Sequence, residues 1–176
     1  EVDMSANWYK EQPTNRNFLN PIGYLLKLEK FEGVDFFCQR ANVPDVTMPT
    51  TEVASPFRNL PIIPGGGVSF GDFTVSFIVD EDLKNYNSIH KWMRDNGNAD
   101  QLQRTTSQSD ILTNGILQIN TSQFNPAFIV EFRNIFPVSL TGLQFDATIT
   151  DVEYITADVT FKHQQFYIND KNNHPL

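Results

Sequence analysis

The fold is decided by residues 69–93, SFGDFTVSFIVDEDLKNYNSIHKWM. Apolar and polar side chains alternate over residues 73–79, which predicts a strand with one face on a core. The period changes at Asp80, Glu81 and Asp82, acids of the kind that cap a helix and favour its dipole. Apolar residues then recur at spacings of three and four, which predicts an amphipathic helix. Its predicted core positions are Leu83, Tyr86, Ile89 and Met93, with Trp92 and His90 at the margins.

Composition limits the class of protein. The chain has 176 residues, of which 40% are hydrophobic and 19% charged, so one domain with a sizeable core is expected. No apolar run approaches the length of a membrane span, and the first residues lack the pattern of a signal peptide. Cys38 is the only cysteine, which excludes an intrachain disulfide and predicts a small buried side chain. The net charge of −8 disfavours nucleic-acid binding, although an acidic wall could let DNA pass without adhesion.

Further strands are predicted on both sides of this stretch. Residues 22–31 form a first strand, and the turn at Glu32 and Gly33 makes residues 34–41 its hairpin partner. Residues 94–110 are an exposed polar loop. The remaining predicted strands are residues 111–121 and 128–136, which form a second hairpin, then 138–145 and 154–166.

About six to eight strands around one helix predict a mainly β fold, an antiparallel sandwich or small barrel with one flanking helix. The predicted organisation has three parts. Residues 1–20 form a polar N-terminal arm, residues 21–168 a single β domain, and residues 169–176 a polar C-terminal tail.

Residues 44–64 contain half of all the prolines, which bars them from the centre of a sheet. They are also apolar, so we predict a projecting hairpin that turns near Pro56 and Phe57. The alternative is a loop folded back over its own core. Exposed apolar edges seek partners, and the predicted subunit interface consists of Val53, Phe57, Leu60 and Ile62.

Catalytic chemistry leaves little trace. His90, His163 and His174 lack metal-ligand spacing, so no metal and no cofactor is predicted. Residues 65–67 are three glycines without the following Lys of a phosphate loop, which favours a hinge or bend. The pairs Asp151/Glu153 and Asp146/Asp158 could be glycosidase carboxylates, but acids are common on loops and strand exteriors. The prediction is that the protein is not an enzyme.

The order of motifs resembles a known family. FFCQRANVPDVTMPTTEVASPFRNLPIIPGG (36–66) is followed by FGDFTVSFIVDEDLKNYNSIHKWM (70–93), FIVEFRNIFPVSLTGLQFD (128–146) and YITADVTFKHQQF (154–166). This progression resembles the tail tube proteins of contractile bacteriophages over most of residues 22–166. The family is in turn similar to the ring protein of type VI secretion.

The resemblance implies a structural virion protein of the phage tail, assembled in the cytoplasm of the bacterial host. Its subunits would form hexameric rings closed through the projecting hairpin, and stacked rings would make a tube through which DNA passes without specific binding. Replacing Phe57 or Ile62 by Asp would then leave a folded monomer that cannot form rings. The implied partners are further copies and adjacent tube, sheath or baseplate proteins, with no membrane. An acidic channel wall would suit the net charge, and its candidates are Asp72, Asp146, Asp151, Glu153 and Asp158.

Three alternatives stay open. The polar N-terminal arm and the loop at residues 94–110 could belong to a baseplate-proximal ring that initiates the tube. The chain could instead build the tube of a type VI secretion system or of a phage-like particle. It could also be a monomeric β-rich module that binds a sugar or peptide, for which a ligand pocket would be required.

Overall fold

The computed structural model describes residues 17–29, 37–54, 56–64, 67–97, 111–148, 153–172 and 174–175. These residues contain one helix, α1 (Lys84–Gly97), and eleven strands. The strands are β1 (Tyr24–Leu28), β2 (Cys38–Ala41), β3 (Val46–Thr47), β4 (Thr50–Ala54), β5 (Asn59–Pro64), β6 (Ser69–Phe70), β7 (Phe73–Ile78), β8 (Thr113–Asn120), β9 (Pro126–Leu140), β10 (Thr156–Lys162) and β11 (Gln165–Asp170).

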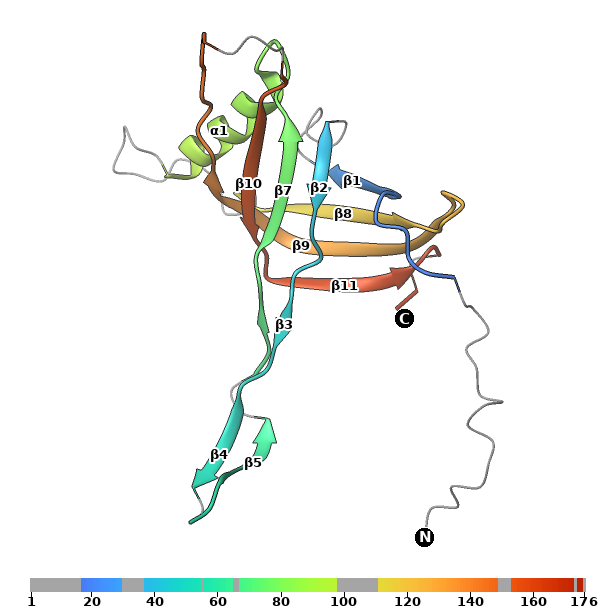
Figure 1. Ribbon diagram of the computed structural model, residues 1–176, viewed down its shortest axis with the longest axis vertical. Helices are drawn as coiled ribbons and strands as arrows, with labels where there is room; N and C mark the ends of the chain where they lie inside the picture. The colour runs from blue at the N-terminus through green and yellow to red at the C-terminus, as the bar shows by residue number, and fades with distance from the viewer. Residues whose placement is uncertain are drawn as a thin grey trace.

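The strands of the body form two layers that share β9. Seven strands pair in the order β1-β8-β9-β10-β7-β2, with β11 also on β9, and every pairing is antiparallel. In Figure 1, β8, β9 and β11 run across the molecule while β2, β7 and β10 run nearly at right angles to them. The predicted antiparallel sandwich or barrel with one flanking helix and a projecting hairpin is confirmed.

Strand β9 turns the corner between the layers. Its register against β8 shifts between Thr113 and Gly115, opposite Asn134, which has a left-handed φ of 55°. A second shift lies between Pro137 and Ser139 of β9, which pair with the consecutive residues Phe161 and Thr160 of β10. Such bulges bend a strand, and a proline is tolerated in a sheet at a bulge. One strand, β9, therefore covers the predicted strand 128–136 and the first residues of the predicted strand 138–145, whereas residues 141–145 lie outside any strand.

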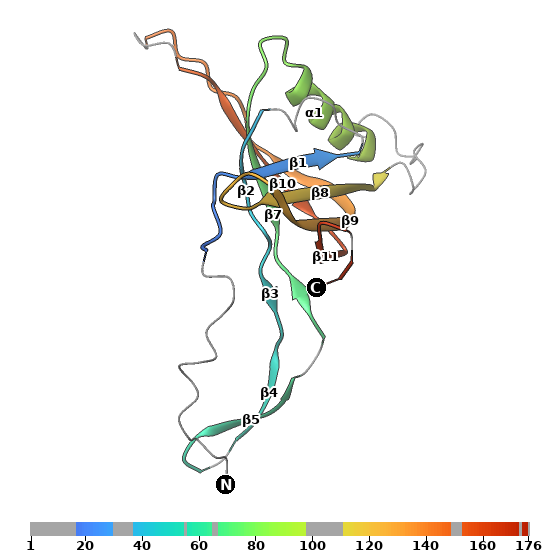
Figure 2. The same ribbon diagram turned by 90° about the vertical axis from the view of Figure 1, so that its right-hand side faces the viewer.

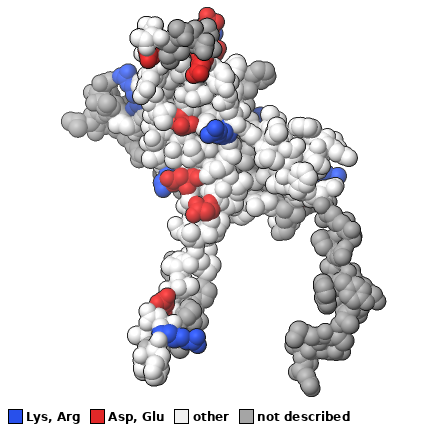
Figure 3. Space-filling model, in the orientation of Figure 1, with Lys and Arg blue, Asp and Glu red and all other residues white. Residues whose placement is uncertain are grey.

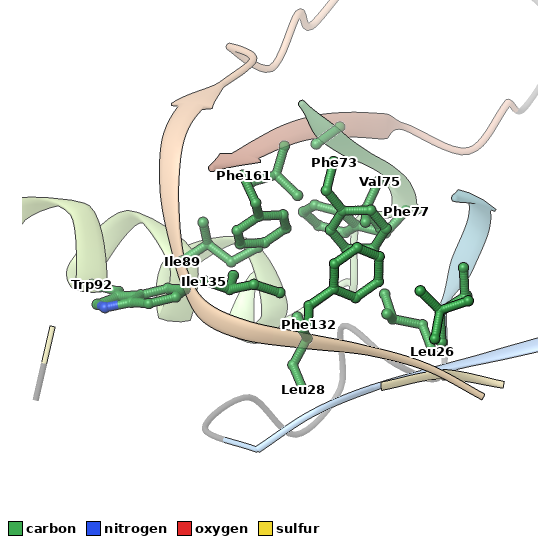
Figure 4. Close-up of a cluster of buried hydrophobic side chains, with 14 residues drawn as sticks. Leu26, Leu28, Phe73, Val75, Phe77, Ile89, Trp92, Phe132, Ile135 and Phe161 are labelled. Atoms are coloured by element: carbon green, nitrogen blue, oxygen red, sulfur yellow. The ribbon is translucent and has the colours of Figure 1, made fainter. Parts of the chain in front are cut away.

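The core lies between the two layers and α1. Phe73, Val75 and Phe77 of β7 are completely buried, as the alternation predicts. Phe73 stacks on Phe132 of β9, with 4.4 Å between the ring centroids, and on Phe161 of β10 at 5.9 Å. Figure 4 shows these rings meeting side chains from β1, β9 and α1. Burying a side chain of this size contributes about 1.5–3 kcal/mol, so this cluster is the main source of stability.

The helix begins later than the acids predict. Asp80–Asp82 lie in the turn before α1, and Leu83 has a left-handed φ of 56°, which ends the turn. The buried Asn85 holds this turn: its Nδ2 donates to the Ile78 carbonyl at 2.8 Å, and its Oδ1 accepts from the Asp80 amide at 3.1 Å. The acids therefore do not occupy the first turn of the helix.

The buried face of α1 also differs from the prediction. Asn85, Ile89 and Trp92 are buried, whereas Leu83 is exposed. The Trp92 Nε1 donates to the Ile111 carbonyl at 2.9 Å, so the ring lies in the core and not at its margin. The helix runs to Gly97 and includes the first part of the predicted loop. The rest of that loop, residues 98–110, lies outside the described residues.

The predicted hairpin of the first two strands is wrong. β1 pairs with β8, with Leu26 opposite Leu117, and β2 pairs with β7. The two strands lie at opposite ends of the sheet order, and a side-chain contact joins them: the Cys38 thiol donates to the Tyr24 hydroxyl at 3.9 Å. Burial, with Cys38 alongside, raises the pKa of Tyr24 to about 12. Cys38 itself is only half-buried.

Strands β3 to β6 form the arm, a narrow extension of the body along the longest axis (Figures 1 and 2). β3 pairs with β6 near the body, and β4 pairs with β5 beyond them. Gly67, with φ of +90°, precedes β6 in a conformation that favours glycine. The arm is the projecting hairpin that the prolines predict, and it does not fold back over the core.

Candidate assembly surfaces

The tip of the arm is apolar and exposed. Val53 and Phe57 are 48% and 97% exposed, and the turn lies at Pro56 and Phe57, as predicted. Of the four predicted interface residues, Val53 pairs with Leu60 across the hairpin, and Ile62 lies further along β5. The side chains of Leu60 and Ile62 lie outside the described part of the chain. An exposed side chain as large as Phe57 at the end of a paired hairpin is suited to contact another surface.

The root of the arm is fixed to the body by aromatic rings. Phe70 of β6 packs on His163 and Phe166, with ring centroids 5.8 and 5.4 Å apart. His163 also contacts Phe132 of the core, at 5.4 Å. Nearby, the Lys162 ammonium pairs with Asp72 at 2.5 Å. These contacts set the direction in which the arm leaves the body.

The outward face of the layer formed by β2, β7 and β10 is polar. Asp158 of β10 lies opposite Ser76 of β7, and the Ser76 hydroxyl donates to the Asp158 carboxylate. Arg40 of β2 lies on the other side of Ser76. Outward positions along β7 and β10 are mostly Thr or Ser, because the apolar residues of each strand point into the core. Figure 3 views the molecule from the side of this layer.

The five predicted channel acids fall in different places. Asp72 and Asp158 lie on this polar face, where Lys162 and Arg40 accompany them. Asp146 and Glu153 lie in the connection from β9 to β10, and both are exposed. Asp151 lies outside the described residues. Hydrogen bonds from Thr148 lower the pKa of Asp146 below its usual value. The structure therefore places two of the five acids on the polar face and two others in the β9–β10 connection.

Three strands lie at the edges of the described sheets. Among the described strands, β1 pairs only with β8, β2 only with β7, and β11 only with β9. An unpaired edge is a template for another strand, and proteins either cover it or use it in assembly. The sequence does not predict these edge strands, because its pattern predicts that β1 and β2 pair with each other.

Signs of catalysis or ligand chemistry are sparse in the described residues. No group of three His, Cys, Asp or Glu side chains converges on a common point there. A groove of about 340 Å³ lies between α1 and Leu140 and is lined by Tyr86, His90, Met93, Arg94 and Gly97. A second hollow, of about 180 Å³, lies beside Phe18, Leu19 and the turn between β8 and β9. The one described helix is neither long nor apolar enough to cross a bilayer.

Comparisons with known proteins agree with this architecture. A sequence model described as phage tail tube protein matches residues 1–169. A search among curated proteins finds no significant match.

Solved structures show the same fold at low sequence identity. The cap that terminates the tube of the anti-feeding prophage has a TM-score of 0.63 and 17% identity, covering 94% of this chain and 99% of the other. The sheath–tube complex of PVC, an extracellular contractile injection system, gives 0.60 and 14%, covering 88% and 93%. The Hcp1 protein of E. coli EAEC 042 gives 0.50 and 11%, covering 86% and 94%.

Proposed function

This chain belongs to the phage tail tube protein family, and we propose that it is the ring-forming structural subunit of a contractile phage tail tube. The proposed ring is hexameric, and rings stack into a tube that conducts DNA. The protein acts through assembly, without catalysis and without a cofactor. It belongs to the virion and assembles in the cytoplasm of the bacterial host.

The observation that carries this proposal is the layer formed by β2, β7 and β10. In β7 and β10 one face is buried in the core and the other is mostly polar, and the order of the described strands ends at β2. Copies placed side by side around an axis would meet at their edge strands and turn the polar faces inward. A heterologous contact that repeats around an axis closes into a ring. The lining of the channel would then be these outward faces.

The charges on that face suit passage without adhesion. Asp72 and Asp158 are accompanied by Lys162 and Arg40, and the remaining outward side chains of β7 and β10 are mostly hydroxyls. Binding to DNA requires clustered Lys and Arg that release counterions from phosphates. A wall that is neither apolar nor basic offers DNA no such cluster. We propose that DNA moves along it without a specific contact.

The partners of the assembled tube would be further tube subunits, the sheath and the baseplate, with no membrane. Two of the similar structures are a cap that terminates a tube and a sheath–tube complex. Because these likenesses concern the fold, a ring that starts or ends the tube remains an alternative role. A tube subunit of a type VI secretion system or of a phage-like particle is a second alternative. A monomeric ligand-binding module is the remaining alternative.

The deciding measurement is the mass and shape of the purified full chain, by light scattering and negative-stain imaging over a range of concentrations. Rings, or tubes built from rings, would support the proposal. A compact monomer at every concentration, also in the presence of purified baseplates from the same phage, would overturn it.

A further inference from the structure

A cluster of exposed apolar side chains lies at the turn between β8 and β9. Phe124 of this turn is 62% exposed, and Phe18, which precedes β1, is 80% exposed. The two segments lie side by side: the Asn120 amide donates to the Gly23 carbonyl at 2.8 Å, and Phe18 lines one hollow together with Ser122. We call this surface the apolar knob, and it consists of Phe18, Leu19, Ile22, Leu25 and Phe124.

The knob has the composition of an interface centre. Residues 17–25 and 118–127 contain no Asp, Glu, Lys or Arg, in a chain that has 13 basic and 21 acidic residues. The five exposed side chains present on the order of 500 Å² of apolar surface, which is comparable to the largest patches on monomeric proteins. Depletion of charge together with exposed aromatic rings is typical of the centre of a protein interface.

The groove beside α1 offers a surface of matching chemistry. Tyr86, Met93 and His90 line it on the helix side, and Leu140 at the end of β9 lines it on the other. The Tyr86 hydroxyl donates to the Thr141 carbonyl at 3.1 Å, which ties the helix to the segment after β9. A methionine side chain adapts to the shape of an aromatic or aliphatic partner. The groove is therefore a defined site suited to apolar side chains.

The knob and the groove lie at opposite ends of β9. The turn that carries Phe124 ends just before Pro126, the first residue of β9, and Leu140 is its last residue. The 15 residues of this strand follow a path of about 50 Å. Figure 1 shows the β8–β9 turn and α1 on opposite sides of the body. One copy cannot fill its own groove with its own knob, whereas a second copy placed beside it in the same orientation can.

We propose that the apolar knob of one copy docks in the groove between α1 and Leu140 of the next copy around the ring. The inference rests on the proposed ring and names the contact that closes it. Because the two surfaces differ, each added copy leaves one knob and one groove unoccupied until the last copy closes the ring. The contact assigns ring closure to the body of the protein in place of the projecting hairpin.

The size of the knob agrees with a contact between neighbours. A stable interface takes about 800 Å² from each partner, and the knob supplies more than half of this area. The adjoining edge strands supply the remainder. Aromatic side chains at the centre of an interface carry most of the binding energy, so one charge in the knob should prevent ring formation.

Charged substitutions in the full chain test the knob. Ile22→Lys and Phe124→Asp should stay folded, because both side chains are exposed. Asp also tolerates the left-handed φ of 61° at position 124. Each variant should lower the fraction of protein in rings by at least about tenfold, measured by light scattering and negative-stain imaging. The matched control is Phe57→Asp, which changes an exposed ring at the tip of the arm and should form rings of unchanged mass.

A cross-link tests whether the groove receives the knob. The starting variant is Cys38→Ala, to which Ile22→Cys and His90→Cys are added together. A short bis-maleimide should join copies of this protein into a ladder that ends at the size of the closed ring. The control carries Lys91→Cys in place of His90→Cys, which moves the thiol by about 100° around the same helix. This exposed position should give no ladder.

The other outcomes contradict the inference. Normal rings from Ile22→Lys and Phe124→Asp would show that the knob is not in the contact. Equal ladders from the His90→Cys and Lys91→Cys proteins, or no ladder from either, would show that the groove is not its partner. Loss of rings in Phe57→Asp would return ring closure to the arm. Circular dichroism identifies a charged variant that is misfolded, and the cross-link then decides. Absence of rings from the unmodified protein would instead count against the proposed function.

Discussion

His163 places a titratable ring where the arm meets the body. Its two ring nitrogens are buried and have no hydrogen-bond partner among the described residues, and its ring packs on Phe70, Phe132 and Phe166. Burial lowers the pKa of His163 below its usual value of 6.5; among the nearby charges, Asp72 acts to raise it and Lys162 to lower it. The folded protein therefore takes up a proton at this site less readily than the unfolded chain does.

The free energy of unfolding should consequently decrease as the pH falls below about 6.5, until the lowered pKa of folded His163 is passed. Above that range the imidazole is neutral in both states and has no effect on the pH dependence. Phe in place of His163 keeps the ring contacts and removes the proton, so it should flatten the profile between pH 7 and pH 5. Urea denaturation at a series of pH values measures this. His90→Gln, at an exposed position, should leave the profile of the natural protein intact; equal slopes in all three proteins would show that His163 is not responsible.

At the scale of elements, the arm is separable from the core. Among the residues of β3 to β6 whose burial the structure describes, none belongs to the buried core cluster, and the arm contacts the body through Phe70. Replacing residues 50–64 by a short Gly-Ser linker should therefore change the free energy of unfolding by less than about 1 kcal/mol. Phe70→Ala keeps the arm but removes the ring contacts at its root, and it should cost about 1–3 kcal/mol. Urea denaturation compares the two; a larger loss from the linker variant would mean that the arm supports the body.

The sequence predicts those elements in which buried and exposed side chains follow one regular spacing. Alternation identifies β7, β10 and the β8–β9 hairpin, because one face of each strand is covered by the core. Alternation does not specify which strands pair with each other. The sequence therefore predicts a hairpin of β1 and β2, whereas β1 pairs with β8 and β2 pairs with β7. The start of α1 was misplaced because a buried side chain, Asn85, holds the preceding turn through two backbone bonds. The sequence predicts separate strands on either side of Pro137, whereas β9 continues through this residue with a bulge beside it.

The candidate surfaces were predictable to a similar extent. Prolines in an apolar segment predict the arm, since such a segment can be neither a central strand nor a soluble loop. Acids were assigned to the channel by net charge alone, which says nothing about which end or face holds them. Ile22 and Phe124 were missed as surface residues, although aromatic and aliphatic residues in segments without charge are a signal for a contact surface.

At the scale of the whole molecule, the proposed ring predicts which surface is enclosed. Thr156 is exposed on the outward face of β10, and Asn87 is exposed on α1, on a different side of the body. The test starts from a variant without the natural cysteine, Cys38→Ala, to which a new cysteine is added at position 156 or 87. Before assembly, either new cysteine should react with a small maleimide and with a maleimide attached to a long polyethylene glycol chain.

After assembly into tubes, Thr156→Cys should still react with the small maleimide. Its reaction with the polymer-linked maleimide should fall at least about tenfold, because a narrow channel excludes the polymer chain. Asn87→Cys should keep reacting with both unless a sheath covers it. Rapid polymer labelling of Thr156→Cys in intact tubes would place the polar face of β2, β7 and β10 outside the channel, and the lining would then have to come from the other layer.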